Sequence, residues 1–172
     1  VDYLLKPFSQ VRFDADGHAV GGEVQVNDFT LGAQYLPDVT VLTNGDYVVT
    51  WSSFWQDWVQ EGGTPHFDYG VYAQRYDSAG NTIGGEFRVN TYTPGSQARS
   101  AVAMDSAGDF VVVWQSMVQD GDGYGIYAQR FNGAGARQYA AGGVLIDNES
   151  SHTVENLLVS CTDGASGAFI GW

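Results

Sequence analysis

The feature that most constrains this chain is an internal repeat marked by a tryptophan. In three places a Trp follows an Asn by 24 residues: Asn27 and Trp51, Asn90 and Trp114, Asn148 and Trp172. Each Asn ends a matching segment, which reads GGEVQVN at residues 21–27, GGEFRVN at 84–90 and, more weakly, GGVLIDN at 142–148. Self-similarity at a fixed spacing is the signature of a repeat architecture. We therefore expect three copies of one structural unit.

The segments between these landmarks predict short β-strands. Runs rich in Val, Tyr, Phe and Trp end at clusters of Gly, Asn and Asp, and no long stretch has a helical apolar period. The first strand of each unit carries the Glu-x-x-Val-Asn segment. Three further strands are expected, at residues 37–41, 45–51 and 70–77 of the first unit and at 100–104, 108–114 and 125–132 of the second. The fold class is therefore predicted as all-β, with four strands in each unit.

The third unit ends at Trp172 without a fourth strand, and the N-terminus supplies a matching segment. Residues 8–17 match the segment 73–80, and 63 residues separate Arg12 from Arg75, as they separate Asn27 from Asn90. We expect one repeat domain over residues 1–172, with units 21–83, 84–141, and 142–172 completed by 1–20. Four-stranded units around an axis indicate a β-propeller-like arrangement. Because three blades close poorly, self-association into a homo-oligomer such as a six-bladed ring is expected; the alternative is a three-lobed β-trefoil or β-prism.

The charge balance excludes some partners. The chain has 172 residues with 20 acidic and 7 basic side chains, a net charge of −13, so binding to nucleic acid is not expected. No apolar run reaches the roughly 18 residues of a membrane span, so membrane insertion is not expected either. A single cysteine, Cys161, allows no internal disulfide. The start at Val1 without a signal peptide is typical of a mature or excised product.

The second unit resembles a repeat found in very large bacterial secreted and surface proteins. The resembling segments are residues 86–91, 101–105, 110–114 and 119–131. Proteins with this repeat often also carry calcium-binding glycine-rich repeats and cadherin-like modules. The resemblance implies a secreted or cell-surface location and a role in adhesion or ligand binding, and it transfers no catalytic residue.

An insertion in the first unit is the strongest functional candidate, because the repeat does not require it. Trp51 and Tyr72 are 21 residues apart, whereas Trp114 and Tyr127 are 13 apart. The extra loop is rich in aromatic and acidic residues, and rings with neighbouring amides and carboxylates are what sugar binding uses. The candidate ligand-binding residues here are Trp55, Asp57, Trp58, His66 and Tyr69. The alternative is that these aromatics form a hydrophobic cluster or an association surface.

The equivalent loop of the second unit adds Gln119, Asp120 and Tyr124 to the predicted ligand-binding residues. Asp120 and Asp122 also form a candidate calcium site, since carboxylates and backbone carbonyls are the oxygen ligands that calcium prefers, although such a run also suits a tight turn. The cofactor prediction is thus calcium or none.

The sequence favours a carbohydrate-binding module or lectin that acts on glycans outside the cell. The first alternative is a structural or adhesive calcium-binding surface repeat, and the second is a glycoside hydrolase. An enzyme is not expected, because the three His residues show no zinc spacing and no Gly-x-Ser-x-Gly motif is present.

Overall fold

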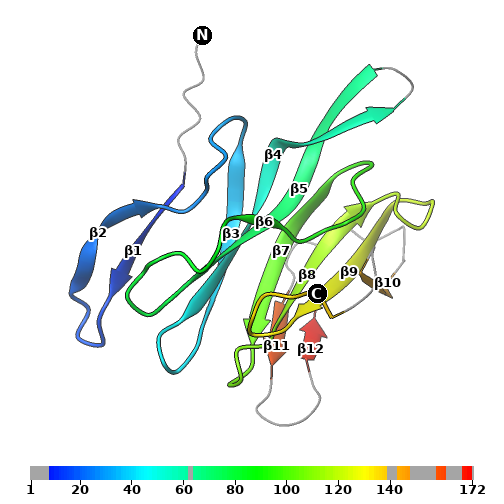
Figure 1. Ribbon diagram of the computed structural model, residues 1–172. Helices are drawn as coiled ribbons and strands as arrows, with labels where there is room; N and C mark the ends of the chain where they lie inside the picture. The colour runs from blue at the N-terminus through cyan, green and yellow to red at the C-terminus, as the bar shows by residue number, and fades with distance from the viewer. Residues whose placement is uncertain (1–7, 62–63, 139–142, 148–157, 162–167, 172) are drawn as a thin grey trace.

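The computed structural model is all-β and describes residues 8–61, 64–138, 143–147, 158–161 and 168–171 (Figure 1). These residues form strands and no helix. The strands are β1 Ser9–Phe13, β2 Ala19–Gln25, β3 Gln34–Val41, β4 Tyr47–Glu61, β5 Thr64–Tyr76, β6 Phe87–Arg88, β7 Gln97–Met104, β8 Phe110–Met117, β9 Tyr124–Phe131, β10 Val144–Asp147, β11 Leu158–Cys161 and β12 Ala168–Gly171. The all-β part of the predicted fold class is confirmed.

Two complete four-stranded antiparallel sheets form the centre of the molecule. Sheet 1 has the order β3-β4-β5-β6, and sheet 2 has the order β10-β9-β8-β7. Two further pairs, β1–β2 and β11–β12, form two-stranded sheets, which we call the N-terminal and C-terminal half-sheets. None of these sheets is closed on itself, so the described strands present open edges.

The hydrogen-bonded sheets are offset by one strand from the units marked in the sequence. The strand that carries Glu-x-x-Val-Asn pairs with the last strand of the preceding unit. Tyr72 of β5 thus lies opposite Arg88 of β6. β10 pairs with β9 and β2 with β1 in the same manner. The physical reason is chain connectivity. Tight turns directly after β1, β5 and β9, closed by the N–H groups of Gly17, Gly80 and Gly135, reverse the chain and favour antiparallel pairing with the strand just before.

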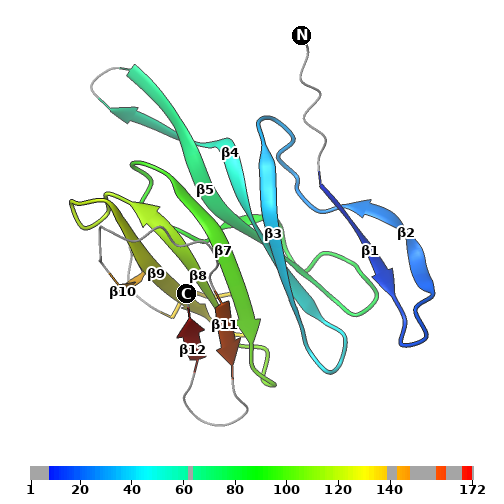
Figure 2. The same ribbon diagram turned by 180° about the vertical axis from the view of Figure 1, so that it is seen from behind.

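The expected pairing of the N-terminal strand with the C-terminal unit does not form within this chain. β1 pairs with β2, and β12 pairs with β11, in separate sheets. Figures 1 and 2 show β1–β2 on one side of β3 and β11–β12 on the other, beside β7. That part of the prediction is wrong for a single chain, because the two half-sheets lie against different complete sheets, which hold them apart.

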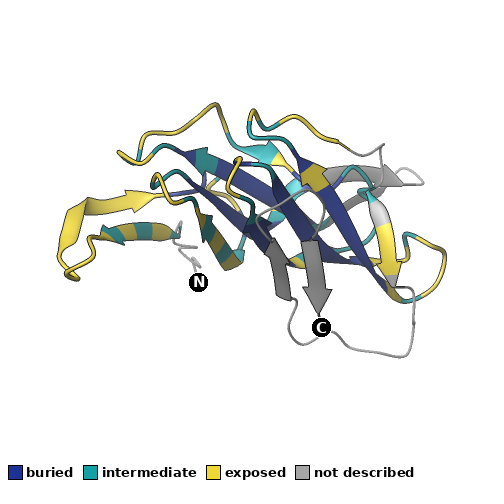
Figure 3. Cartoon of the chain, turned by 90° about the horizontal axis from the view of Figure 1, so that it is seen from below, coloured by how far each residue is buried: buried dark blue, intermediate teal, exposed yellow. Residues whose placement is uncertain are grey.

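The core lies between the sheets, which stack so that unlike faces of neighbouring sheets are in contact. Side chains alternate between the two faces of a strand, so each complete sheet has an aromatic face, which carries its Trp, and an aliphatic face. The aromatic face of sheet 2, with Trp114, packs on the aliphatic face of sheet 1, with Val48 and Val71. The aromatic face of sheet 1 holds Trp51 and contacts Phe8, just before β1. Trp51 and Trp114 are buried, and Figure 3 shows burial concentrated in the complete sheets.

Burial of two tyrosine hydroxyls, one of them in this core, predicts a loss of stability at alkaline pH. Burial is the largest cause that raises the pKa values of Tyr35 and Tyr76 from 10.0 to about 12. Their contribution to stability is complete below pH 10 and is lost as the pH rises toward 12, because the unfolded chain releases these protons first. Urea unfolding at a series of pH values should therefore give a falling free energy over this window. A free energy that stays constant between pH 10 and pH 12 would contradict the expectation.

Candidate functional site

The insertion in the first unit forms an extended hairpin, where the sequence suggested a loop. β4 and β5 continue past the sheet, and their paired residues include Trp58 with Phe67 and Val59 with His66. We call residues 57–61 and 64–68 the arm; it projects beyond the neighbouring strands (Figure 1). Aromatic and β-branched residues favour extended pairing, which explains why the extra residues lengthen the two strands. The predicted residues Trp58 and His66 therefore lie on opposite strands of the arm.

A β-bulge at the base of the arm determines where two predicted site residues point. The pairing passes from Phe54 opposite Tyr69 to Asp57 opposite Asp68, so Trp55 and Gln56 are extra residues on β4. Trp55 has a φ of 74°, outside the region that a bulky residue usually adopts. The bulge leaves Trp55 48% exposed and Asp57 only 1% exposed.

The same backbone distortion occurs in sheet 2 with a different side chain. Val118 has a φ of 54° and stands at the repeat position of Trp55, followed by Gln119 as Trp55 is followed by Gln56. The unusual backbone therefore belongs to the repeat itself. Of these two units, only the first has a tryptophan at this position.

Four aromatic rings, which we call the aromatic cluster, surround the bulge. The ring of Tyr69 packs 4.9 Å from that of Tyr35 and 4.7 Å from that of Phe54. The ring of Phe54 in turn lies 5.7 Å from that of Trp55. The first three rings are partly buried and Trp55 is exposed, so the cluster supports one outward-facing indole on a packed base.

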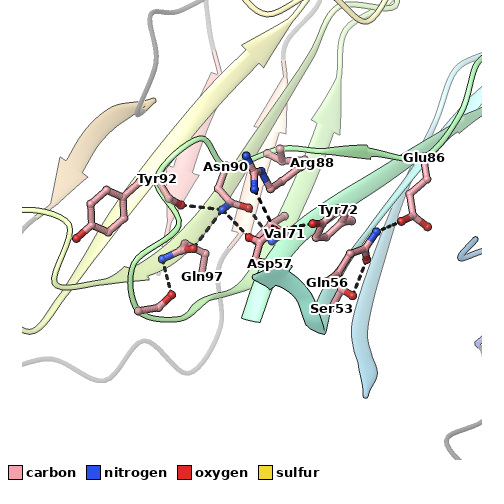
Figure 4. Close-up of polar contacts among 12 residues, drawn as sticks. Ser53, Gln56, Asp57, Val71, Tyr72, Glu86, Arg88, Asn90, Tyr92 and Gln97 are labelled. Carbon is pink, nitrogen blue, oxygen red and sulfur yellow. Dashed lines mark hydrogen bonds and ion pairs between the residues drawn. The ribbon is translucent and has the colours of Figure 1, made fainter. Parts of the chain in front are cut away.

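Below the bulge, Asp57 is the centre of a buried polar network (Figure 4). Its carboxylate accepts hydrogen bonds from the Tyr72 hydroxyl at 2.5 Å, from Arg88 Nη1 at 3.1 Å and from Asn90 Nδ2 at 3.3 Å. Burial, followed by the hydrogen bond to Asp57, raises the pKa of Tyr72 well above its ordinary value. The structure thus places Asp57 in the interior, where it anchors the base of the arm instead of facing solvent.

A second polar group contains Gln56, the residue that follows Trp55 in the bulge. Gln56 donates to the carboxylate of Glu86 and accepts a hydrogen bond from the Ser53 hydroxyl at 2.7 Å (Figure 4). Glu86 also accepts from the backbone N–H of Asp28 at 2.7 Å. Both Gln56 and Glu86 are partly exposed. Gln56 thus supplies an amide within the bulge that carries Trp55, and Glu86 supplies a carboxylate in contact with that amide.

Sequence reasoning missed Tyr35, Gln56 and Glu86. A comparison of the units would have pointed to Tyr35, since Ala98 stands at its place in the second unit, just as Val118 stands at that of Trp55. Glu86 had no such signal, because it lies in a segment shared by the first two units.

The predicted residues of the second unit lie at the corresponding end of sheet 2. Asp120, Asp122 and Tyr124 are exposed and Gln119 is partly buried. The carboxylate of Asp120 accepts the backbone N–H of Asp122 at 3.3 Å, which is the hydrogen bond of a tight turn. Calcium binding by Asp120 and Asp122 stays a prediction, and melting temperatures measured with calcium and with a chelator would test it.

Three side chains of the types that bind metal ions lie in the turn between β1 and β2. Asp14, Asp16 and His18 are exposed, and one donor atom from each lies within 4.8 Å of the others. The Asp14 carboxylate accepts the backbone N–H groups of Asp16 and His18, and Asp105 does the same for Ala107 and Asp109. This arrangement is thus a turn of the repeat.

No protein-family model and no curated protein matches the chain. Among the residues described, there is no helix of the length and apolar character needed to span a membrane.

Proposed function

We propose that this chain is a glycan-binding module that acts outside the cell, with the aromatic cluster as its contact surface. The observation that carries the proposal is the exposed indole of Trp55 at a repeat position where the second unit has Val118. Both residues adopt the same unusual backbone, so the fold does not require a tryptophan there. An exposed tryptophan that the architecture does not need is best explained by binding.

The chemistry of the cluster fits a sugar. A flat indole offers apolar area at a low cost in conformational entropy and stacks on the C–H face of a pyranose ring. Gln56 and Glu86 are partly exposed and hydrogen-bonded to each other. The second N–H of the amide and the remaining lone pairs of the carboxylate can still exchange hydrogen bonds with sugar hydroxyl groups. The net charge of −13 favours a neutral glycan over an anionic one.

The hydrogen bonds of the nearby carboxylates favour binding over glycoside hydrolysis. Hydrolysis commonly needs two carboxyl groups that flank the scissile bond. Asp57 is buried and already accepts three hydrogen bonds, and Glu86 is engaged by Gln56 and by the N–H of Asp28. Neither group is free to act as the pair that this reaction uses.

The surrounding architecture supports a propeller-like repeat. Each complete sheet presents its aromatic face to the aliphatic face of the preceding one, which is the stacking expected of propeller blades and not of a trefoil or prism. We propose a propeller-like arrangement on this ground. Its role is to hold the arm and the aromatic cluster at one end of sheet 1.

The proposal predicts that Trp55→Ala weakens glycan binding at least tenfold, which is about 1.4 kcal/mol. A glycan array identifies a ligand for the unmodified protein, and titration calorimetry then compares the variants. Val118→Ala, at the equivalent position of sheet 2, should bind like the unmodified protein. An array without binding at high protein concentration, or equal affinities for Trp55→Ala and Val118→Ala, would overturn the proposal.

A further inference from the structure

The two half-sheets are complementary parts of one four-stranded sheet. In the C-terminal half-sheet Val159 lies opposite Ile170, which is the register of Val39 with Val49 in β3–β4 and of Val102 with Val112 in β7–β8. β11–β12 therefore corresponds to the first two strands of a complete sheet.

The N-terminal half-sheet corresponds to the last two strands. Gln10 lies opposite Val24, at positions equivalent to Ala73 and Phe87 of β5–β6. Among the described strands, β1 pairs only with β2 and β12 only with β11, so each half-sheet has an open edge where the other half belongs.

The N-terminal half-sheet contacts sheet 1 through a hydrogen bond that recurs between sheet 1 and sheet 2. Arg12 donates to the Ser78 carbonyl at 2.6 Å, and the repeat-equivalent Arg75 donates to the Gly133 carbonyl at 2.5 Å. The ring of Phe8 also packs 5.2 Å from that of Trp51. The half-sheet thus occupies the position of a four-stranded sheet that would precede sheet 1. It supplies the last two strands of that sheet, and the first two are missing.

An apolar groove of about 610 Å³ lies where those two strands are missing. Its lining includes Val11, Phe13, Val39, Val41 and Val49. Val39 is 54% exposed, whereas Val102 at the same repeat position is 5% exposed, because Val102 packs against Val48 and Val71 of the preceding sheet. The groove therefore continues the interface that already joins sheets 1 and 2, with the covering strands absent.

We propose that the β11–β12 hairpin of a second copy of this chain fills the groove, with β12 antiparallel to β1. The register of β4–β5 and β8–β9 then places Ile170 of one copy opposite Val11 of the other. The chain's own hairpin does not reach this groove, since β11 contacts β7 and β8 on the far side of the molecule (Figure 2). The reciprocal junction closes a two-chain ring of two complete sheets from each copy and one composite sheet at each junction.

Closure of the ring removes the open edges, which in an isolated chain would pair unspecifically. The dimer also presents two copies of the aromatic cluster. The pairing rests on the repeat geometry alone and stands whether or not a glycan binds there.

Disulfide trapping between two differently substituted chains tests the pairing. Chains with Val11→Cys are mixed with chains with Ile170→Cys, both with Cys161→Ser to remove the native thiol, and are then oxidised. We expect covalent dimers of twice the 18.6 kDa chain mass. Val24→Cys replaces Val11→Cys in the control: its side chain is 48% exposed against 43% for Val11, but it lies on β2. Equal yields in the two mixtures would overturn the proposal, as would a Val11→Cys/Ile170→Cys double variant that closes within one chain.

A charged residue introduced into the groove tests the proposal independently. The side chain replaced, Val39, is exposed in the isolated chain. Light scattering should give the dimer mass for the unmodified protein. Val39→Asp should raise the dissociation constant of the dimer at least tenfold, whereas Val24→Asp, outside the groove, should not. A monomeric unmodified protein, or a dimer unaffected by Val39→Asp, would show that the groove does not hold a second copy.

Discussion

Replacement of Trp114 with alanine is expected to lower the free energy of unfolding by about 4 kcal/mol, the cost typical of removing a buried tryptophan. Trp114 is buried between the two complete sheets, and its ring stacks on that of Tyr127 at 6.4 Å. Its indole N–H has no hydrogen-bond partner among the described residues. The expected loss is therefore one of packing, measured by urea unfolding of the two proteins.

Trp55→Ala is the matched control for this prediction. It removes the same side chain from a position that is about half exposed, so the loss should be about 1 kcal/mol or less. The two variants separate structure from function: Trp114→Ala destabilises the fold, and Trp55→Ala affects the proposed binding. Equal losses of stability would contradict the assignment of Trp114 to the core and of Trp55 to the surface.

Arg88→Met is expected to lower the free energy of unfolding by about 2 kcal/mol, because it removes the cation from a fully buried carboxylate. Solvent reduces the effect below that of a fully buried ion pair, since the Arg88 side chain is 40% exposed. Asp57 is buried, and Arg88 is its cationic partner at 3.1 Å. Methionine keeps the unbranched apolar part of the side chain and removes the charge. Chemical denaturation at neutral pH measures the difference.

Arg130→Met is the control, because Arg130 pairs with Asp109 at 2.8 Å where both side chains are partly exposed. Ion pairs in solvent contribute about 1 kcal/mol or less, so this variant should remain close to the unmodified protein. If the Arg88 and Arg130 variants lost equal stability, the Asp57 network would not be an anchor of the arm.

The sequence predicted the strands and the repeat because both depend on local patterns. The equal spacing of Asn27 to Trp51 and of Asn90 to Trp114 reflects the same turn and strand lengths in two units. The amide of Asn90 donates to the Tyr92 carbonyl at 2.8 Å, so this Asn satisfies the backbone just after its segment. Asn148 and Trp172 lie outside the described residues.

The environment of Asp57 could not be predicted, because it depends on contacts between distant residues. Gln56-Asp57 and Gln119-Asp120 look equivalent in sequence, yet Asp57 is buried and Asp120 is exposed. The Arg88 that compensates Asp57 comes from the next unit of the sequence. Its counterpart in the third unit is Ile146, so no cation is available for Asp120 at that position.

The pairing of whole strands likewise could not be predicted from the sequence. The repeat shows that residues 8–17 belong to the same strand type as 71–80, but a periodic pattern does not say which copy of a strand a given edge will meet. In this chain β1 and β12 each pair with the neighbouring strand in sequence, and the open edges of the half-sheets remain.

The indole N–H signals in a nitrogen-proton correlation spectrum are the decisive measurement, because two of the chain's five tryptophans, Trp51 and Trp114, are buried and act as internal controls for Trp55. On addition of the glycan found on the array, we predict a shift of the Trp55 signal, with the signals of the buried Trp51 and Trp114 unchanged. An unperturbed Trp55 signal at saturating glycan would contradict the account.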